Sequence, residues 1–370
     1  MGRQGASKFL HKAKKSKSDE FYTQYVDIQK EVEAYLEYNP DTFRDKVVYC
    51  NCDDPYESNF FRYFVLNFER IGLKRLITTS YKPSPVANTQ LQLFGDNETV
   101  KQTKGRPKVT ANKFIINSVG DIDGDGEFSL KDVALQLKQN KENEWAPLEG
   151  DGDFRSVESI ELLKQADYVI TNPPFSLFRE YIKQLDDYGK KFLIIGNINS
   201  ISYREVFALI KENKIWLGTG MGRWISGFIV PESYELYGTE ARIDEDGNRI
   251  VATNNCLWLT NLDHGKRHQP LPLMTMNDNI KFSSHKNVKG LGYKKYDNYD
   301  AIEVPFTDAI PSDYDGVMGV PITFLDKYNP EQFEIIGQMV TTKVDDLNHG
   351  YPYVDGKKIF ARILIKKRVN

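Results

Sequence analysis

The feature that most constrains the fold is a regular alternation of short apolar segments with longer amphipathic ones between residues 46 and 217. Short apolar strands separated by helices are typical of parallel βαβ units, in which helices cover both faces of a mostly parallel sheet. The strands are expected at 46–50, 73–79, 167–171, 191–196 and 214–217. The helices are expected at 19–38, 58–70, 156–165, 177–185 and 203–211. We therefore predict an α/β fold whose ligand site lies at the carboxyl ends of the strands.

The first of these helices, at 19–38, shows one apolar side. Its buried residues are expected to be Val26, Ile28, Val32, Tyr35 and Leu36. Asn39 and Pro40 are expected to end the helix, since proline cannot continue it.

Two regions depart from the alternation. Residues 81–149 are rich in Pro, Gly, Asn and Lys and have the composition of an insertion between two βα units. From 218 to 370, helical periodicity gives way to short strands and turns. The sequence therefore predicts a basic, flexible segment at 1–18, a catalytic cofactor-binding domain at 19–217, and a separate, smaller, mainly β region at 218–370 that recognises the substrate.

Composition narrows the class of protein. The 370 residues contain no apolar run long enough to span a bilayer, and we expect no signal peptide. Cys50, Cys52 and Cys256 are too few for a disulfide framework, so a reducing cytoplasm is the expected location. The net charge of −3 argues against a passive, charge-driven nucleic-acid binder. It does not argue against an enzyme whose basic groups gather on one face.

A rigid polar corner, Asn172-Pro173-Pro174-Phe175, follows the expected strand at 167–171. The prolines cannot continue a sheet, so they fix the backbone and turn its carbonyls away from the strands. The Asn172 side-chain oxygen and the Pro173 carbonyl can then accept both hydrogens of an exocyclic amino group, which directs its lone pair at a methyl donor. Phe175 offers a flat face for a base that has left its duplex. We predict a catalytic role for all four residues; the competing interpretation is a simple strand-ending turn.

Two segments are candidates for binding a cofactor that has no phosphates. Phe21-Tyr22-Thr23 lies at the amino end of the first predicted helix, where the Thr23 hydroxyl and nearby amides could bind a carboxylate; a plain helix cap is the alternative. Asn51, Asp53 and Asp54 follow the strand at 46–50 and lack the glycines of a dinucleotide loop. The acids could face the ammonium and sulfonium groups of S-adenosylmethionine, or form a solvent-exposed turn.

A third candidate segment is the glycine-rich stretch at 150–155. Asp153 could accept a hydrogen bond from the adenine amino group of the cofactor, and Phe154 could form an aromatic wall beside it. A glycine turn that caps the following helix is the alternative, above all for Asp151. Asn172 is also counted among the cofactor-binding candidates because it would lie next to the methyl group.

An acidic loop at 121–132 has the spacing of an EF-hand calcium loop. Gly126 occupies the sharp turn and a helix follows the loop. The candidate ligands are Asp121, Asp123, Asp125, Glu127 and Asp132. Asp in place of Glu at the last position shortens the reach and favours a weaker site. Calcium would be structural, because catalysis does not need it; the alternative is a hydrated acidic turn.

Taken together, these segments resemble the EcoRI-type adenine-specific DNA modification methylases, which methylate N6 of adenine. The likeness is carried by residues 10–24, 48–55, 150–156 and 171–175, and further by 213–218, 227–231, 234–244 and 316–324. It covers most of the chain apart from about 83–147 and residues 341–370. The insertion departs from the short form of that family, so its part in target choice stays open.

The resemblance implies a Rossmann-like methyltransferase fold, S-adenosylmethionine as donor, and duplex DNA as substrate with the adenine flipped out. Residues 218–370 would then be a DNA target-recognition region. The implied cofactor residues are Tyr22, Thr23, Asp53, Asp153 and Phe154, and the implied catalytic residues are Asn172, Pro173 and Phe175. Whether a cognate restriction endonuclease acts on the same site, without a stable complex, stays open.

Candidates for contact with DNA phosphates are basic residues, many with aromatic neighbours. They are the lysines of 1–18, Arg223, Arg242, Arg249, Lys266, Arg267, His268, Lys294 and Lys295, with Trp224, Tyr293 and Tyr296. For any one of them, a solvated surface charge is the competing interpretation.

Two other functions compete with DNA methylation. One keeps the fold and the donor but acts on RNA or on a protein glutamine, since Asn-Pro-Pro loops also serve planar amides. The other is a catalytically silent DNA-binding module that has kept the fold; an intact Asn-Pro-Pro-Phe argues against it.

Overall fold

The computed structural model describes residues 22–52, 58–81, 111–139, 142–221, 225–230, 241–245, 247–251 and 255–368. The chain forms two compact units. Unit 1 comprises Met1–Ile198 and Gly220–Leu262, and unit 2 comprises Asn199–Thr219 and Asp263–Asn370. None of the helices in the described ranges has both the length and the apolar character needed to cross a membrane.

A large mixed sheet forms the centre of the fold, with strand order β5-β4-β3-β2-β6-β7-β12-β8. Its strands are β2 (Val47–Cys50), β3 (Arg75–Thr79), β4 (Asn112–Ile116), β5 (Glu144–Pro147), β6 (Tyr168–Thr171), β7 (Lys191–Asn197), β8 (Trp216–Met221) and β12 (Cys256–Thr260). The four strands β3, β2, β6 and β7 are parallel neighbours. Strand β4 pairs antiparallel with β3, and β12 pairs antiparallel with β7. Strand β5 pairs antiparallel with β4 at the edge of the sheet. This mixed sheet confirms the predicted α/β class with a parallel centre.

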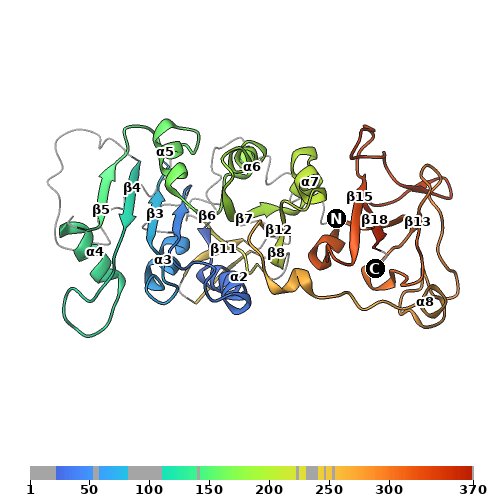
Figure 1. Ribbon diagram of the computed structural model, residues 1–370, viewed down its shortest axis with the longest axis horizontal. Coiled ribbons are helices and arrows are strands. Elements are labelled where there is room, and N and C mark those ends of the chain that lie inside the picture. Colours follow the sequence, from blue (N-terminus) through green and yellow to red (C-terminus); the bar gives the residue numbers. More distant parts are fainter. Residues whose placement is uncertain are drawn as a thin grey trace. The chain divides into compact units, whose positions relative to one another are not determined.

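Helices lie on both sides of this sheet (Figure 1). On one side are α2 (Tyr25–Tyr38) and α3 (Asn59–Leu66), and on the other are α5 (Val157–Gln165) and α6 (Phe178–Asp187). Because side chains alternate along a strand, Val48 and Cys50 of β2 join the buried cluster that contains Ile28, Val32 and Tyr35 of α2. Serine caps start two of the helices: Ser58 accepts from Phe60 N at 3.1 Å, and Ser156 accepts from Ser159 N at 3.2 Å.

The first helix differs from its prediction at its start and on its buried side. It begins at Tyr25, because Tyr22–Thr23 (β1) pairs as a strand with β9 (Phe228–Val230). Val26 is 41% exposed and Leu36 is only partly buried, whereas Ile28, Val32 and Tyr35 are fully buried. The prediction for Val26 was wrong: two acids, Asp27 and Glu31, occupy the buried face in its place.

The insertion at 81–149 contributes to the central sheet. Its described part contains β4, α4 (Leu130–Gln139) and β5, and the two strands extend the sheet beyond β3. Val133 and Leu137 of α4 pack in the same buried cluster as Phe114 of β4.

The region after residue 218 also contributes to unit 1. Strand β12 lies in the central sheet between β7 and β8. A smaller sheet has the order β1-β9-β11-β10, with β10 at Ala241–Ile243 and β11 at Arg249–Val251. The structure therefore divides at residues other than the expected boundary at 217, since a short apolar strand does not reveal which sheet it will join.

Unit 2 contains its own small sheet, of order β13-β14-β18-β15. Its elements are α7 (Arg204–Lys211), α8 (Met276–Phe282), β13 (Ile302–Glu303), β14 (Met318–Pro321), β15 (Phe333–Met339), β18 (Arg362–Lys367) and the hairpin of β16 (Tyr353–Val354) with β17 (Lys357–Lys358). A buried ion pair between Arg362 and Glu303 joins β18 to β13, and the Tyr296 hydroxyl donates to the same carboxylate.

Candidate functional site

The candidate site lies where β2 and β6 end. Strand β2 leads to β3 on one side, and its neighbour β6 leads to β7 on the other side. The connections that follow β2 and β6 therefore run in opposite directions along the sheet. In parallel α/β sheets, ligands bind at such a switch point, outside the carboxyl ends of the strands. The register is fixed at the other end of the strands, where Val47 N donates to Asp167 Oδ2 at 2.8 Å. Asn51 and Asn172 are the first residues beyond the carboxyl ends of β2 and β6.

Asn51 links the two strand ends and helix α6. Its backbone carbonyl accepts a hydrogen bond from the Thr171 hydroxyl, and its side-chain oxygen accepts one from the Tyr181 hydroxyl. Asn51, Thr171 and Tyr181 are all buried. These contacts hold the predicted cofactor residue Asn51 beside the start of the predicted catalytic corner.

The Asn-Pro-Pro-Phe corner turns directly from β6 into a short 3₁₀ helix, Phe175–Leu177 (η3), and then into α6. Asn172 is half-buried and its side-chain oxygen is shielded from solvent. Pro173 is buried, and Pro174 holds an extended backbone with φ −62° and ψ 119°. The carbonyl of Pro174 accepts from Leu177 N at 3.0 Å. The corner is therefore fixed by proline geometry and by the helix that follows.

Phe175 connects this corner to the amino-terminal segment. Its half-buried ring packs edge-on against Phe228, with ring centroids 6.4 Å apart and planes at 66°. Phe228 pairs across the small sheet with Thr23. The predicted cofactor residue Thr23 is thereby brought to the same part of unit 1 as the predicted catalytic residue Phe175.

Thr23 is the predicted cofactor residue with the clearest capacity to bind a ligand. Its carbonyl accepts from Asn59 Nδ2 at 2.8 Å, and the residue is only 3% exposed. Its hydroxyl is buried and has no hydrogen-bond partner among the described residues. A buried hydroxyl of this kind fits a polar ligand group. Tyr22 is described only as part of β1, and Phe21, Asp53 and Asp54 lie outside the described residues.

The glycine-rich turn at 150–155 is held against the end of β3. Gly152 has φ +78°, and a Cβ at this position would lie 2.0 Å from the Ser80 carbonyl oxygen. Only glycine allows this approach. The turn therefore reaches the carboxyl edge of the sheet, as its predicted role requires.

Within this turn, Asp153 and Phe154 both have close neighbours. Arg155 contacts Asp153 through two side-chain nitrogens, at 2.9 and 2.7 Å, and holds the pKa of Asp153 below its usual range. The ring of Phe154 is 4% exposed and packs against Tyr181 at 5.0 Å. Their cofactor roles stay predictions, since Arg155 already pairs with the carboxylate.

Sequence reasoning missed two buried acids on α2. Asp27 Oδ2 accepts from Ser226 N at 2.9 Å and from Ser226 Oγ at 2.8 Å, and Glu31 Oε2 accepts from Gly220 N at 2.8 Å. Burial raises the pKa of Asp27, and the hydrogen bonds from Ser226 oppose this shift. The two acids are four residues apart among apolar positions of the helix, a signal that could have been noticed.

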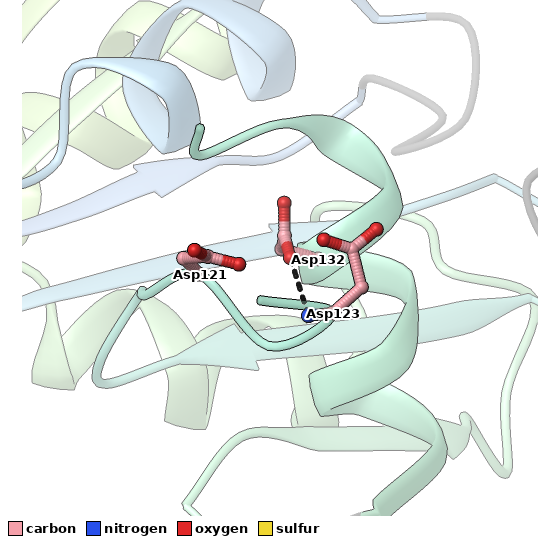
Figure 2. A group of neighbouring side chains, drawn as sticks. All are labelled: Asp121, Asp123 and Asp132. Atoms are coloured by element: carbon pink, nitrogen blue, oxygen red, sulfur yellow. Dashed lines mark hydrogen bonds between the residues drawn. The ribbon is translucent and has the colours of Figure 1, made fainter. Parts of the chain in front are cut away.

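In the acidic loop at 121–132, Asp121, Asp123 and Asp132 lie close together (Figure 2). One carboxylate oxygen from each lies within 4.8 Å of the others. Asp132 is buried and accepts from Ile122 N at 2.8 Å, from Asp123 N at 3.2 Å and from Ser129 N at 2.8 Å. These backbone bonds lower the pKa of Asp132 to about 2. Lys131 pairs with Asp123 at 2.6 Å, and Asp125 and Glu127 are exposed outside this group of three.

Several of the predicted DNA-contact residues have partners within the protein. Lys266 pairs with Asp326 at 2.6 Å, and Arg267 stacks over Trp216 at 3.5 Å. The remaining contacts are His268 with Asp263, Lys294 with Asp355, Lys295 with Asp300, Arg242 with the Ser226 carbonyl, and Tyr293 with the Ala309 carbonyl. Tyr296 is buried, Arg249 is partly buried in β11, and residues 1–18, Arg223 and Trp224 lie outside the described residues.

Comparison with known proteins gives a consistent result. A protein-family model described as adenine-specific methyltransferase EcoRI matches residues 9–368. The type II methyltransferase M.EcoRI of Escherichia coli is 52% identical over 370 residues, which cover 100% of this chain and 99% of that protein. M.MpnI of Mycoplasma pneumoniae is 34% identical, with 98% of this chain and 99% of that protein covered. M.MgeORF184P of Mycoplasma genitalium is 35% identical, with 97% and 98% covered. No solved structure matches the chain.

Proposed function

The chain belongs to the EcoRI family of adenine-specific methyltransferases and is therefore an adenine-specific DNA methyltransferase. From this premise, we propose which residues bind the methyl donor and which act on the adenine. In this proposal, a methyl group passes from S-adenosylmethionine to the N6 amino group of an adenine flipped out of duplex DNA, at the edge where β2 and β6 end. The observation that carries the proposal is the position of Asn172 beside Asn51, with Thr171 and Tyr181 holding the two strand ends together.

The residues at this edge fit S-adenosylmethionine. The buried Thr23 hydroxyl, which has no partner among the described residues, can take a polar group of the donor. No phosphate-binding glycine loop follows β2, in agreement with a donor that has no phosphates. We assign Thr23, Asn51, Asp153 and Phe154 to the donor, and from the sequence also Phe21, Tyr22, Asp53 and Asp54. When bound, the donor supplies an electrophilic methyl group on a sulfonium.

The protein's own part in the reaction is to orient the amino group and to hold the flipped base. The Asn172 side-chain oxygen and the Pro173 carbonyl accept the two amino hydrogens, which concentrates the nitrogen lone pair toward the methyl group. Phe175, supported by Phe228, stacks on the flipped base. As the bond from N6 to the methyl carbon forms, the bond from that carbon to sulfur would break and leave its electron pair on sulfur as a neutral thioether. The amino proton becomes acidic and would pass to solvent, so no strong base is required.

The test is transfer of labelled methyl from S-adenosylmethionine to duplex DNA, to RNA and to protein in parallel, followed by digestion. We expect the label in duplex DNA, recovered as N6-methyldeoxyadenosine. Label in RNA or in a protein glutamine would favour the competing substrates of the same fold. The absence of saturable S-adenosylmethionine binding would favour a silent DNA-binding module.

We also propose that the loop at 121–132 takes a calcium ion with a structural role. The support is the approach of Asp121, Asp123 and Asp132, since clustered carboxylate oxygens are the ligands that calcium prefers. Asp132 already closes the loop through backbone hydrogen bonds, so we expect calcium to add stability without being required for folding.

Thermal unfolding with calcium, with magnesium and with a chelator tests this site. Calcium should raise the melting temperature of the native protein, and Asp121→Asn should abolish the rise while methyl transfer stays unchanged. Equal melting temperatures with calcium and with the chelator would show the loop to be a hydrated acidic turn.

A further inference from the structure

Residues 280–292 of unit 2 form a compact turn at the end of α8. Gly290 N donates to the Ile280 carbonyl at 2.8 Å and closes the turn. Inside it, Lys289 N donates to the His285 carbonyl at 2.9 Å, which makes one helical turn. Val288 is fully buried, so the turn is anchored in the unit.

The backbone places three lysines together on the outer side of this turn. His285 and Val288 are three residues apart on the inner side, where the His285 ring stacks on Phe306 at 3.6 Å. Lys286 and Lys289 are likewise three residues apart, on the neighbouring outer side, and both are exposed. The bond between Ile280 and Gly290 brings exposed Lys281 next to Lys289.

These three lysines differ in electrostatic environment from those that follow them. Lys294 pairs with Asp355 at 2.5 Å and Lys295 with Asp300 at 3.3 Å. In the parts of the chain that the structure describes, no carboxylate forms an ion pair with Lys281, Lys286 or Lys289. The nearby acids have other partners: Asp308 binds His285 and Asp278 binds Thr275. The three positive charges are therefore available to an external anion.

Two large apolar residues are close to these lysines in the sequence. Phe282 is 69% exposed and Leu291 is 71% exposed, and each is adjacent in sequence to the closed part of the turn. An isolated exposed apolar residue needs no explanation, but three exposed lysines and two exposed apolar residues within one short turn fit a polyanion that also offers apolar edges. Duplex DNA has this chemistry, with phosphates on both sides of sugar and base edges.

We propose that Lys281, Phe282, Lys286, Lys289 and Leu291 form a DNA-binding surface, here called the 281–291 surface. The lysines contact phosphates, and Phe282 and Leu291 contact sugar or base edges between them. The inference rests on the proposed function only for the identity of the ligand, since a DNA methyltransferase must hold its duplex. It assigns a role to residues that lie outside the site at the ends of β2 and β6.

The test is the salt dependence of binding to a fluorescently labelled duplex of mixed sequence, measured by anisotropy on the full-length protein. Each lysine that contacts a phosphate contributes about one unit to the slope of log K against log salt. Lys281→Gln, Lys286→Gln and Lys289→Gln should each lower the slope by about 1, and the triple variant by about 3. Lys74→Gln is the matched control, because Lys74 is exposed and lies before the amino end of β3, away from the strand ends that form the site.

Phe282→Ala provides a second, independent measurement. It should weaken binding roughly fivefold with no change in slope, because it removes a contact without removing a charge. Phe360→Ala, at a residue that is 67% exposed in the same unit, is the control and should leave the affinity unchanged.

The outcomes separate this inference from the proposed function. Equal salt slopes for the triple variant and the wild type would overturn the 281–291 surface, even if the wild type methylates DNA. A wild type that binds the duplex with the expected slopes but transfers no methyl group would overturn the proposed function and leave the surface standing. A circular-dichroism spectrum and a melting temperature equal to those of the wild type show that unit 2 of each variant has folded, and retained S-adenosylmethionine binding shows the same for unit 1.

Discussion

At the scale of single residues, substitutions of Asn172 and of Thr23 are expected to affect different quantities, the first kcat and the second the affinity for S-adenosylmethionine. Asn172 contacts the adenine in the proposed mechanism, whereas Thr23 contacts the donor. Asn172→Ala should lower kcat by about 10²–10³, the usual effect of removing one acceptor or donor that acts in the transition state. Its affinity for S-adenosylmethionine should stay close to that of the wild type, as measured by calorimetry.

Thr23→Val is the matched variant with the opposite expectation. Loss of one hydrogen bond should weaken S-adenosylmethionine binding about fivefold, and kcat at saturating donor should be nearly unchanged. Equal losses of binding and turnover in both variants would contradict the assigned roles.

His264 in unit 2 makes the stability of that unit depend on pH. It is 2% exposed, lies 2.9 Å from the Leu217 carbonyl oxygen through Nε2, and burial lowers its pKa to about 4. Between pH 4 and 6.5 the unfolded chain binds a proton that the folded chain does not, so stability falls as the pH falls through this window. By pH 4 the loss should reach about 3 kcal/mol.

Urea unfolding of unit 2 from pH 7 to pH 4 measures this effect. His264→Gln keeps a side-chain donor without the titrating ring, so its free energy of unfolding should fall less over the same range. Parallel pH dependence in the two proteins would show that His264 is protonated equally in the folded and unfolded states.

At the scale of elements, α2 fixes the segment that carries Phe228. Asp27 binds both Ser226 N and Ser226 Oγ, and Gln24 Nε2 donates to the Gly227 carbonyl at 3.1 Å. Asp27→Ala leaves buried donors without their acceptor and should destabilise unit 1 by about 2 kcal/mol. It should also lower methyl transfer, because Phe228 supports Phe175.

Asp27→Asn keeps an acceptor for Ser226 and removes the buried charge, so it should restore most of the activity and stability. Asp41→Ala is the control: Asp41 pairs only with Arg44 at an exposed position, and its loss should change stability by less than about 0.5 kcal/mol. Equal effects of the Ala and Asn substitutions at Asp27 would rule out this positioning role.

The elements also show what a sequence can predict. The strands β2, β6 and β7 and the rigid turn after β6 were predictable, because apolar runs and the Asn-Pro-Pro-Phe turn are local signals. The pairing of Thr23 with Phe228 was not predictable, since it joins residues about two hundred positions apart without a local signal. For the same reason the sequence could not show that β12 enters the central sheet, or that Gly152 packs against Ser80.

At the scale of the whole molecule, charge patterns in the sequence did not show which basic side chains are already paired within the protein. Lys266 and Lys294 looked available in the sequence, but both are paired with aspartates in the structure. The lysines of the 281–291 surface were not singled out, because their lack of carboxylate partners among the described residues is a property of the fold. The net charge of −3 of the whole chain therefore does not show that the 281–291 surface is locally basic.

In the proposed mechanism, the corner at Asn172 directs a methyl group to the amino nitrogen of adenine in duplex DNA. Its most direct test is single-molecule sequencing of DNA from cells that express either the wild type or Asn172→Ala. We expect N6-methyladenine in one sequence context with the wild type, and a far smaller fraction of those adenines modified with the variant at equal protein level. Equal fractions of modified adenines in the two samples, or no modified adenine in either, would contradict this role of Asn172.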